Sequence, residues 1–259
     1  MKRFVLSAPP DPDGLVRLYE KDYHYLVRVR RLRAGMYFDA VLPGGEAVRV
    51  RVISTANNTL TGECLEPASG HTDLQLPAPP VIVLFQGLPK GQKMDLIVRQ
   101  AAEAEVSIIV PFQSEHSTGG EKLKRWEKIT QEARQQSGSR VETRIMPINN
   151  VEEMLVFWDS LKKEYENSLG ILLHQELLEK ASFHGYLGNS PDLTALAVGP
   201  EGGFSPKEVS LFLAAGFKPL LMGNSVLRTE TAALYGIAAV RTMLTESEHW
   251  TSRQKESDS

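Results

Sequence analysis

The chain of 259 residues has one cysteine, no long apolar run and no excess of positive charge. The single cysteine, Cys64, excludes an intrachain disulfide and fits a reducing compartment. No apolar run approaches the roughly 20 residues that a membrane-spanning helix needs. The net charge of −3 excludes a uniformly basic nucleic-acid binder, but a local basic face remains compatible with it.

Targeting and metal-binding signals are also missing. Met1 to Pro10 holds only a short apolar stretch before Pro9 and Pro10, so we expect no signal peptide and a cytoplasmic protein. His24 and His116 have no metal-ligand spacing to any cysteine, so we expect no metal site. The chain has neither a Walker motif nor a G-x-G-x-x-G fingerprint, which removes two well-known phosphate-binding loops.

The N-terminal part has the pattern of short strands. Residues 1–66 are predicted to be all-β, with strands at Met36–Leu42, Ala47–Ile53 and Thr59–Leu65 separated by turn residues. Short strands with tight turns predict a small barrel. We therefore expect a β-barrel domain over residues 1–70 and a proline-rich linker over residues 71–80.

After the linker, apolar strands alternate with amphipathic helices. This alternation predicts an α/β domain over residues 81–246, with a mostly parallel sheet covered on both faces, and a polar tail over residues 247–259. The predicted strands are 81–84, 107–110, 144–146, 169–173, 193–198 and 219–220. The predicted helices are 94–104, 123–136, 151–165, 209–215 and 229–244.

The stretch from Ala197 to Glu208 reads as a strand, a glycine-rich loop and a helix start. Ser205 fits an N-cap, Pro206 the first helical position and Glu208 the third. A second loop of similar composition runs from Met222 to Arg228. Two strand–loop–helix corners close together in the chain indicate one ligand site at the carboxyl ends of neighbouring strands, although ordinary βα turns also contain glycine.

Three polar side chains in these loops have open interpretations. Arg228 opens the last helix, where the helix dipole favours anions, so it either points into a site or pairs with Glu230. Glu201 either binds a ligand or accepts hydrogen bonds from loop amides. His174 ends an apolar strand, and a lone histidine there is more often a core residue than a catalyst.

Two basic stretches are candidates for binding an RNA backbone. One contains Arg28, Arg30, Arg31 and Arg33, and the other runs from Lys122 to Arg140 with interleaved glutamates. A charge run of this kind is also typical of a solvated face.

The paired C-terminal motifs resemble a known family. Gly199–Phe204 followed by Leu227–Ala232 is similar to the motifs of the RsmE group of SPOUT-class methyltransferases, which modify N3 of a uridine in 16S ribosomal RNA with S-adenosylmethionine. Weaker similarities occur at Met1–Phe4, at His24 to Arg31, and at Leu88–Gly91.

This resemblance implies a SPOUT-type α/β trefoil-knot domain preceded by a PUA-like β-barrel that binds RNA. It further implies a homodimer, S-adenosylmethionine as cofactor, and 16S ribosomal RNA or the small ribosomal subunit as partner. We predict neither a membrane nor a metal partner. A non-catalytic ribosome-assembly factor and a nucleotide-dependent enzyme acting on a small molecule remain as alternatives.

The expected site residues follow from the loops together with the resemblance. The catalytic candidates are Arg228, which would donate to a uracil oxygen as charge develops there, and Glu201. The cofactor-binding candidates are Leu172, Leu173, His174, Gly199, Glu201, Gly202, Gly203, Met222, Gly223, Asn224, Val226, Leu227 and Thr231. The RNA-binding candidates are Arg3, His24, Arg28, Arg30, Arg31, Lys90, Lys122, Arg125, Arg134 and Arg140.

Overall fold

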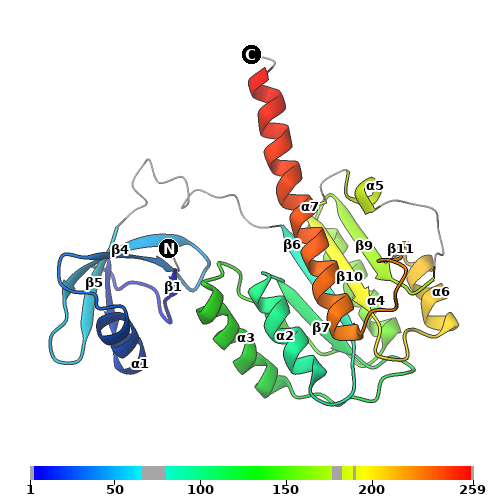
Figure 1. Ribbon diagram of the computed structural model, residues 1–259, viewed down its shortest axis with the longest axis horizontal. Coiled ribbons are helices and arrows are strands. Elements are labelled where there is room, and N and C mark those ends of the chain that lie inside the picture. The colour runs from blue at the N-terminus through cyan, green and yellow to red at the C-terminus, as the bar shows by residue number, and fades with distance from the viewer. Residues whose placement is uncertain (1–2, 66–79, 177–182, 189–190, 258–259) are drawn as a thin grey trace. The chain divides into compact units, whose positions relative to one another are not determined.

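The chain forms two compact units in the computed structural model (Figure 1), which describes residues 3–65, 80–176, 183–188 and 191–257. One unit comprises Met1–Ala78 and Arg134–Glu142, and the other Pro79–Ala133 and Thr143–Ser259. Each unit has its own hydrophobic core. The predicted linker, residues 71–80, lies outside the described residues except for Pro80.

The N-terminal unit is built on a five-stranded mixed sheet with the strand order β1-β3-β4-β5-β2. β1 runs parallel to β3, and the other neighbours are antiparallel. Its elements are β1 (Phe4–Val5), β2 (Leu15–Leu18), α1 (Glu20–Tyr23), the π-helix η1 (His24–Val29), β3 (Tyr37–Val41), β4 (Ala47–Ser54) and β5 (Leu60–Leu65). The three predicted strands are confirmed as β3, β4 and β5. The structure supports a mixed sheet, and closure into a barrel stays a prediction.

The all-β prediction for residues 1–66 is wrong between β2 and β3, where α1 and η1 form a continuous helical segment. Tyr23 and Leu26 are 8% and 0% exposed and pack in the core of this unit. They lie three positions apart, which is the spacing of one face of a helix. The helical segment therefore buries Tyr23 and Leu26 in the core, while Arg28 and Arg31 stay exposed.

The segment Arg134–Glu142 belongs to the N-terminal unit and is fixed there by arginines. Arg134 is 9% exposed and donates to the carbonyl oxygens of Pro43 (3.1 Å) and Ser139 (3.4 Å). Arg140 Nε donates to the Gly45 carbonyl oxygen at 3.2 Å. Burial lowers the pKa of the Arg134 guanidinium, and the nearby Glu142 carboxylate partly offsets this effect. Both arginines thus hold backbone carbonyls within this unit.

The C-terminal unit is an α/β domain with a six-stranded sheet in the order β11-β9-β10-β6-β7-β8. All of its strand pairs are parallel, as predicted. Its elements are β6 (Val81–Gly87), α2 (Lys93–Glu103), β7 (Ile108–Phe112), α3 (Leu123–Ser137), β8 (Arg144–Ile145), α4 (Val151–Leu161), the 3₁₀ turn η3 (Lys162–Glu164), β9 (Ser168–Leu173), α5 (Phe183–Leu187), β10 (Leu193–Val198), α6 (Pro206–Ala214), β11 (Lys218–Leu220) and α7 (Thr229–Ser257).

Helices cover both faces of this sheet (Figure 1). Residues of α2, α3 and α7 form one core layer with alternate strand residues, and residues of α4 and α6 form the other. Successive strand residues point to opposite faces, so Leu173 lies in the first layer and Leu172 in the second. Because of this alternation, only every second side chain at the end of a strand points to a given face of the sheet and can contact a ligand there.

Several element boundaries differ from the sequence prediction, and α4 for instance ends at Leu161 and is followed by η3. β6 continues past Leu84 to Gly87, because Phe85 and Gln86 are also buried in the sheet. α7 continues past Leu244 to Ser257, and α5 was not predicted. In the part of the chain that the structure describes, no helix has the length and apolarity needed to cross a membrane.

Candidate active site

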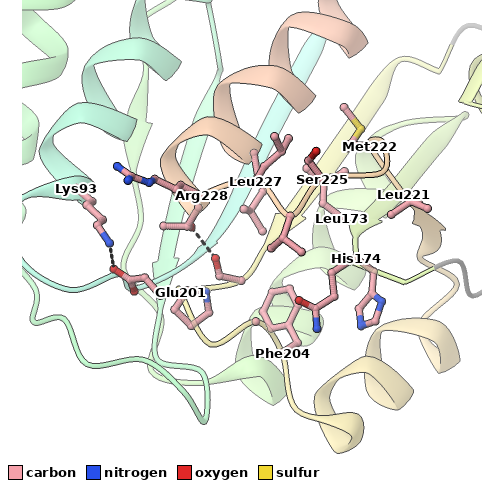
Figure 2. A pocket seen from close by; sticks show the side chains of 18 residues that line it. Lys93, Leu173, His174, Glu201, Phe204, Leu221, Met222, Ser225, Leu227 and Arg228 are labelled. Atoms are coloured by element: carbon pink, nitrogen blue, oxygen red, sulfur yellow. Dashed lines mark hydrogen bonds and ion pairs between the residues drawn. The ribbon is translucent and has the colours of Figure 1, made fainter.

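A cavity of about 360 Å³ lies at the carboxyl ends of the neighbouring strands β9, β10 and β11 (Figure 2). The predicted residues that line it are Leu173, His174, Gly199, Glu201, Gly203, Met222, Val226, Leu227 and Arg228. The further lining residues are Lys93, Gln175, Val198, Pro200, Phe204, Leu221, Ser225, Thr229 and Ala232. The three predicted ligand loops therefore meet around one space, whose size suits a small-molecule ligand.

Five predicted cofactor residues do not line the cavity: Leu172, Gly202, Gly223, Asn224 and Thr231. The side chain of Leu172 is buried in the core layer on the opposite face of the sheet. Gly202 faces away toward His116, because a Cβ on it would lie 2.8 Å from the His116 Cβ. Gly223, Asn224 and Thr231 are exposed beside the cavity.

Two glycines explain the composition of the loop after β10. Gly203 has a φ of +69°, a conformation that favours glycine, and the space beside its Cα is open. Gly199 has no room for a side chain, because a Cβ would lie 3.0 Å from the Gly203 backbone. The loop thus folds back on itself and presents bare backbone to the cavity.

The predicted start of α6 is confirmed. Ser205 accepts a hydrogen bond from the Glu208 N–H at 3.3 Å, and the Glu208 carboxylate accepts one from the Ser205 N–H at 2.8 Å. Pro206 occupies the first helical position. The other Glu208 oxygen accepts from the Glu115 N–H at 2.9 Å, so this buried glutamate also ties down the loop after β7. These contacts fix the far end of the glycine-rich loop.

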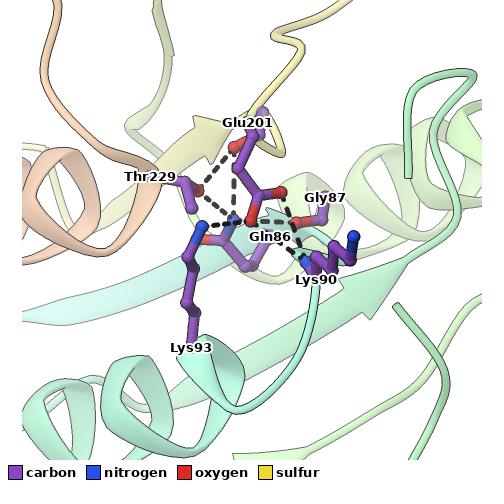
Figure 3. A network of polar contacts seen from close by, with 7 residues as sticks. Gln86, Gly87, Lys90, Lys93, Glu201 and Thr229 are labelled. Carbon is purple, nitrogen blue, oxygen red and sulfur yellow. Dashed lines mark hydrogen bonds and ion pairs between the residues drawn. The ribbon is translucent and has the colours of Figure 1, made fainter. Parts of the chain in front are cut away.

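A buried polar clasp fixes the near end of the same loop (Figure 3). The Thr229 hydroxyl donates to the Gly199 carbonyl oxygen at 2.6 Å and accepts from Gln86 Nε2 at 3.0 Å. Gln86 Nε2 also lies 2.9 Å from the Gly87 carbonyl oxygen. Gln86 is 0% and Thr229 5% exposed. The clasp therefore joins the end of β6, the loop after β10 and the first residue of α7.

Glu201 is held as a carboxylate. Both of its oxygens lie 3.2 Å from the Lys90 N–H, and one forms an ion pair with Lys93 Nζ (Figure 3). Partial burial raises the pKa of Glu201, but the hydrogen bond from Lys93, the loop amides and the charge of Lys93 together lower it below its usual value. Glu201 is consequently a poor proton acceptor at neutral pH, which argues against a catalytic role for it. It connects the loop before α2 to the loop after β10.

Arg228 is exposed at the cavity and precedes the first helical residue of α7. Its carbonyl oxygen accepts the first helical hydrogen bond, from the Ala232 N–H at 2.8 Å. Within the described residues, its guanidinium has neither an ion pair nor a hydrogen bond, so the alternative of pairing with Glu230 is not realised. A cation held at a helix N-terminus without an acidic partner is available to a negatively charged group of a ligand.

His174 is not a core residue. It is half-buried on the cavity wall, and its Nδ1 accepts a hydrogen bond from the Glu176 N–H at 3.1 Å. The expectation from a lone histidine in an apolar strand is therefore wrong, because β9 ends at Leu173 and the ring lies in the loop.

The cavity has a polar and an apolar end. Figure 2 shows Lys93, Glu201 and Arg228 together on one side, whereas Leu173, Met222 and Leu221 gather on the other. Lys93 was not among the predicted site residues, although it carries the same sequence signal as Arg228. It is a cation at the first position of a helix, where the dipole disfavours positive charge.

The RNA candidates of the N-terminal unit separate into two kinds of arginine. Arg28 and Arg31 are exposed and Arg30 is half-buried at the end of η1, and none of these guanidiniums has a polar partner among the described residues. In contrast, Arg49 and Arg51 on β4 are neutralised by cross-strand carboxylates, at 3.0 and 2.7 Å. The unpaired guanidiniums of Arg28, Arg30 and Arg31 therefore give the N-terminal unit a positively charged region at the end of η1.

The remaining RNA candidates have varied surroundings. Lys90 and Lys122 in the C-terminal unit and His24 in the N-terminal unit are exposed, and Arg3 is half-buried. The Arg125 guanidinium is bound by Asp95 at 2.7 Å. Arg134 is buried and Arg140 donates to a backbone carbonyl, so the structure gives both a structural role in place of the predicted phosphate contact. No cluster of three or more metal-ligating side chains occurs in the described ranges.

Comparisons with known proteins agree on one family. A family model described as an RNA methyltransferase domain matches residues 76–241. Ribosomal RNA small subunit methyltransferase E of Synechocystis sp. is 31% identical over 247 residues, which cover 93% of this chain and 78% of the relative. The protein of the same name from Bacillus subtilis is 25% identical and covers 85% of this chain and 87% of the relative.

A solved structure extends this similarity to the fold. The structure of ribosomal RNA small subunit methyltransferase E from Neisseria gonorrhoeae, bound to S-adenosyl methionine, matches with a TM-score of 0.73 and 26% identity. The match covers 94% of this chain and 98% of that chain. Because a family model covers more than half of the sequence and a relative at least 30% identical spans nearly all of it, this chain is a member of the ribosomal RNA small subunit methyltransferase E family.

Proposed function

We propose that this protein transfers a methyl group from S-adenosylmethionine to N3 of a uracil in 16S ribosomal RNA. The observation that carries the proposal is the unpaired Arg228 guanidinium at the polar end of a cavity within the matched RNA methyltransferase region. Family membership supports the reaction, and a ribosomal substrate would fit a cytoplasmic protein. The names of the relatives give methylation of small-subunit ribosomal RNA, and the uracil N3 target is what the resemblance of the loop motifs implies.

The residues of the cavity fit this cofactor. Leu173, Met222 and Leu227 offer an apolar surface for an adenine ring, and Gly203 leaves open space beside bare backbone. The charged side chains at the other end suit the polar methionine part of the molecule. When bound, S-adenosylmethionine supplies an electrophilic methyl group on a sulfonium.

The protein's own residues then act on the base. N3 of uracil is protonated at neutral pH and lies in the Watson–Crick edge, so the protein must take an unpaired or flipped base. Arg228 donates to a uracil carbonyl oxygen and stabilises the negative charge that develops as N3 passes its proton to water. The clasp of Thr229 and Gln86 holds the start of α7, and with it Arg228, against the Gly199 loop. Holding Arg228 in place in this way contributes to the rate of methyl transfer.

Two experiments test this assignment. Calorimetric titration with S-adenosylmethionine and with NAD separates it from a nucleotide-dependent enzyme acting on a small molecule, because only the first ligand is expected to bind. A methyl-transfer assay on deproteinised 16S ribosomal RNA separates it from a non-catalytic assembly factor. Transfer to the RNA supports the proposal, and its absence with a cofactor-bound protein contradicts it.

We also propose the finer architecture that the family implies: a trefoil knot in the C-terminal unit, a PUA-like N-terminal domain and a homodimer. Tyr235 on α7 is 55% exposed and Val226 in the cavity loop is 77% exposed, which leaves large apolar side chains at the surface for a second copy to cover. Sedimentation equilibrium tests the dimer.

The free arginines at the end of η1 are expected to hold RNA phosphates. Replacing Arg31 by glutamine should weaken RNA binding several-fold and reduce the slope of log K against log salt by about one, the value for a lost phosphate contact. Arg51→Gln is the matched control, since Arg51 is already paired with Glu63. Filter binding across a salt series measures both variants. Equal slopes for Arg31→Gln and the unmodified protein would assign the RNA contact elsewhere.

A further inference from the structure

An ion pair forms part of the cavity wall at its polar end. Lys93 comes from the first turn of α2 and Glu201 from the loop after β10, and both line the cavity. Their side chains are 38% and 36% exposed, so the pair is accessible to a ligand. Figure 2 shows the two charged groups next to each other and apart from the apolar side chains Leu173 and Met222. The cavity thus offers one positive and one negative charge at the same end.

Each partner keeps binding capacity beyond the pair. An ammonium group has three N–H donors, and among the described residues Lys93 Nζ meets only the Glu201 carboxylate. A carboxylate has about four lone-pair positions, and Glu201 uses some of them for Lys93 and the Lys90 N–H. The lowered pKa of Glu201 keeps it negatively charged at neutral pH. The pair therefore presents fixed charges of both signs.

We propose that Lys93 and Glu201 form the subsite for the α-amino-carboxylate of the methyl donor, with Lys93 donating to its carboxylate and Glu201 accepting from its ammonium. This inference rests on the proposed function, because it concerns the methionine part of S-adenosylmethionine. A zwitterion and an ion pair are complementary: each charge of the ligand meets an opposite charge of the protein, and no net charge is buried.

The surroundings favour this ligand group over a simple structural role for the pair. The Lys90 N–H already connects Glu201 to the loop before α2, so the Lys93 side chain is not needed for that connection. Because α2 carries Lys93 at its first position, a bound carboxylate also lies at a helix N-terminus, where an anion is stabilised.

Calorimetry with two nucleosides tests the subsite. S-adenosylhomocysteine carries the amino-carboxylate, whereas 5′-methylthioadenosine lacks it and keeps the adenosine. We expect Lys93→Gln to weaken S-adenosylhomocysteine binding about tenfold, the order expected for one partly exposed charge-assisted hydrogen bond. Binding of 5′-methylthioadenosine should not change. Lys207→Gln is the matched control, since Lys207 also pairs with a glutamate, Glu152, but does not line the cavity.

The outcomes distinguish the subsite from the proposed function. If the unmodified protein binds neither nucleoside, the proposed function fails. If it binds both and Lys93→Gln affects them equally, or affects neither, the subsite is overturned while the function stands. A variant that keeps full affinity for S-adenosylhomocysteine but loses affinity for RNA would likewise overturn the subsite and assign Lys93 to a phosphate. Glu201→Gln should also weaken binding of S-adenosylhomocysteine and leave binding of 5′-methylthioadenosine unchanged, because the carboxylate that accepts from the ligand ammonium is lost.

Discussion

Replacing Arg228 by alanine should lower the single-turnover rate of methyl transfer by about 100- to 1,000-fold, the range for losing one donor to a developing oxyanion. The affinity for S-adenosylmethionine should stay nearly unchanged, because apolar side chains, loop backbone and the Lys93–Glu201 pair provide the expected cofactor contacts. The reason lies in the position of Arg228. Its guanidinium is at the cavity, and among the described residues it has no acidic partner that would neutralise it.

Rapid-quench kinetics with saturating RNA, together with calorimetry, measure the two quantities separately. Arg228→Lys should recover only part of the rate, because an ammonium lacks the planar fork of donors. Arg99→Ala removes an exposed arginine on α2 that does not line the cavity and should match the unmodified protein. A parallel loss of cofactor affinity and rate in Arg228→Ala would mean that Arg228 binds the cofactor, contrary to the role assigned here.

Replacing Thr229 by valine should affect stability, cofactor affinity and rate together. Valine has nearly the same shape but removes both hydrogen bonds of the hydroxyl, to Gly199 at 2.6 Å and from Gln86 at 3.0 Å. The half-buried Gly199 carbonyl loses its shorter hydrogen bond and keeps only the longer one from Gln86, at 3.4 Å, so the free energy of unfolding should fall by about 1–2 kcal/mol. The Gly199 loop and the start of α7 also lose their shared anchor, which should loosen the cavity wall and displace Arg228.

Thr229→Ser is the conservative control, because serine keeps the hydroxyl and should restore most of the stability, affinity and rate. Denaturant unfolding, calorimetry and single-turnover kinetics measure the three quantities. The comparison with Arg228→Ala separates a positioning residue from a group that touches the substrate, since only Thr229→Val should change cofactor affinity. Stability and affinity unchanged in Thr229→Val would show that the clasp does not hold the loop.

Local sequence signals predicted the parts of this structure that depend on neighbouring residues. The start of α6 follows from Ser205, Pro206 and Glu208, which lie within one turn and cap the helix themselves. The alternation of valine and arginine from Val48 to Val52 predicted β4, because a strand places successive side chains on opposite faces. The same rule, applied at the end of β9, separates Leu172 from Leu173 and would have excluded the Leu172 side chain from the cavity.

Contacts between segments that are distant in the chain could not be predicted from local sequence patterns. Gln86 and Thr229 are 143 positions apart, and Lys93 and Glu201 are 108 positions apart, so their pairing depends on the order of strands in the sheet. The sequence held one signal for the contact of Gln86, namely that this glutamine lies in an otherwise apolar strand. Such a residue must find a partner when it is buried. The alternatives left open for Glu201 were decided by the same long-range contacts, which bind its carboxylate to α2 and the preceding loop.

The arginines show how composition alone can mislead. Arg134 and Arg31 belong to similar basic stretches in the sequence. In the structure Arg134 is 9% exposed and donates to backbone carbonyls, whereas Arg31 is exposed at the end of a π-helix. Burial separates a structural cation from one available to RNA, and burial depends on the tertiary packing of the N-terminal unit.

The most direct test of the central claim is mass spectrometry of nucleosides from 16S ribosomal RNA that lacks the modification. The RNA is incubated with S-adenosylmethionine and either the unmodified protein or Arg228→Ala. We predict N3-methyluridine with the unmodified protein, dependent on S-adenosylmethionine, and almost none with the variant. No methylated nucleoside with a folded, cofactor-bound protein, or methylation at another atom, would contradict the account.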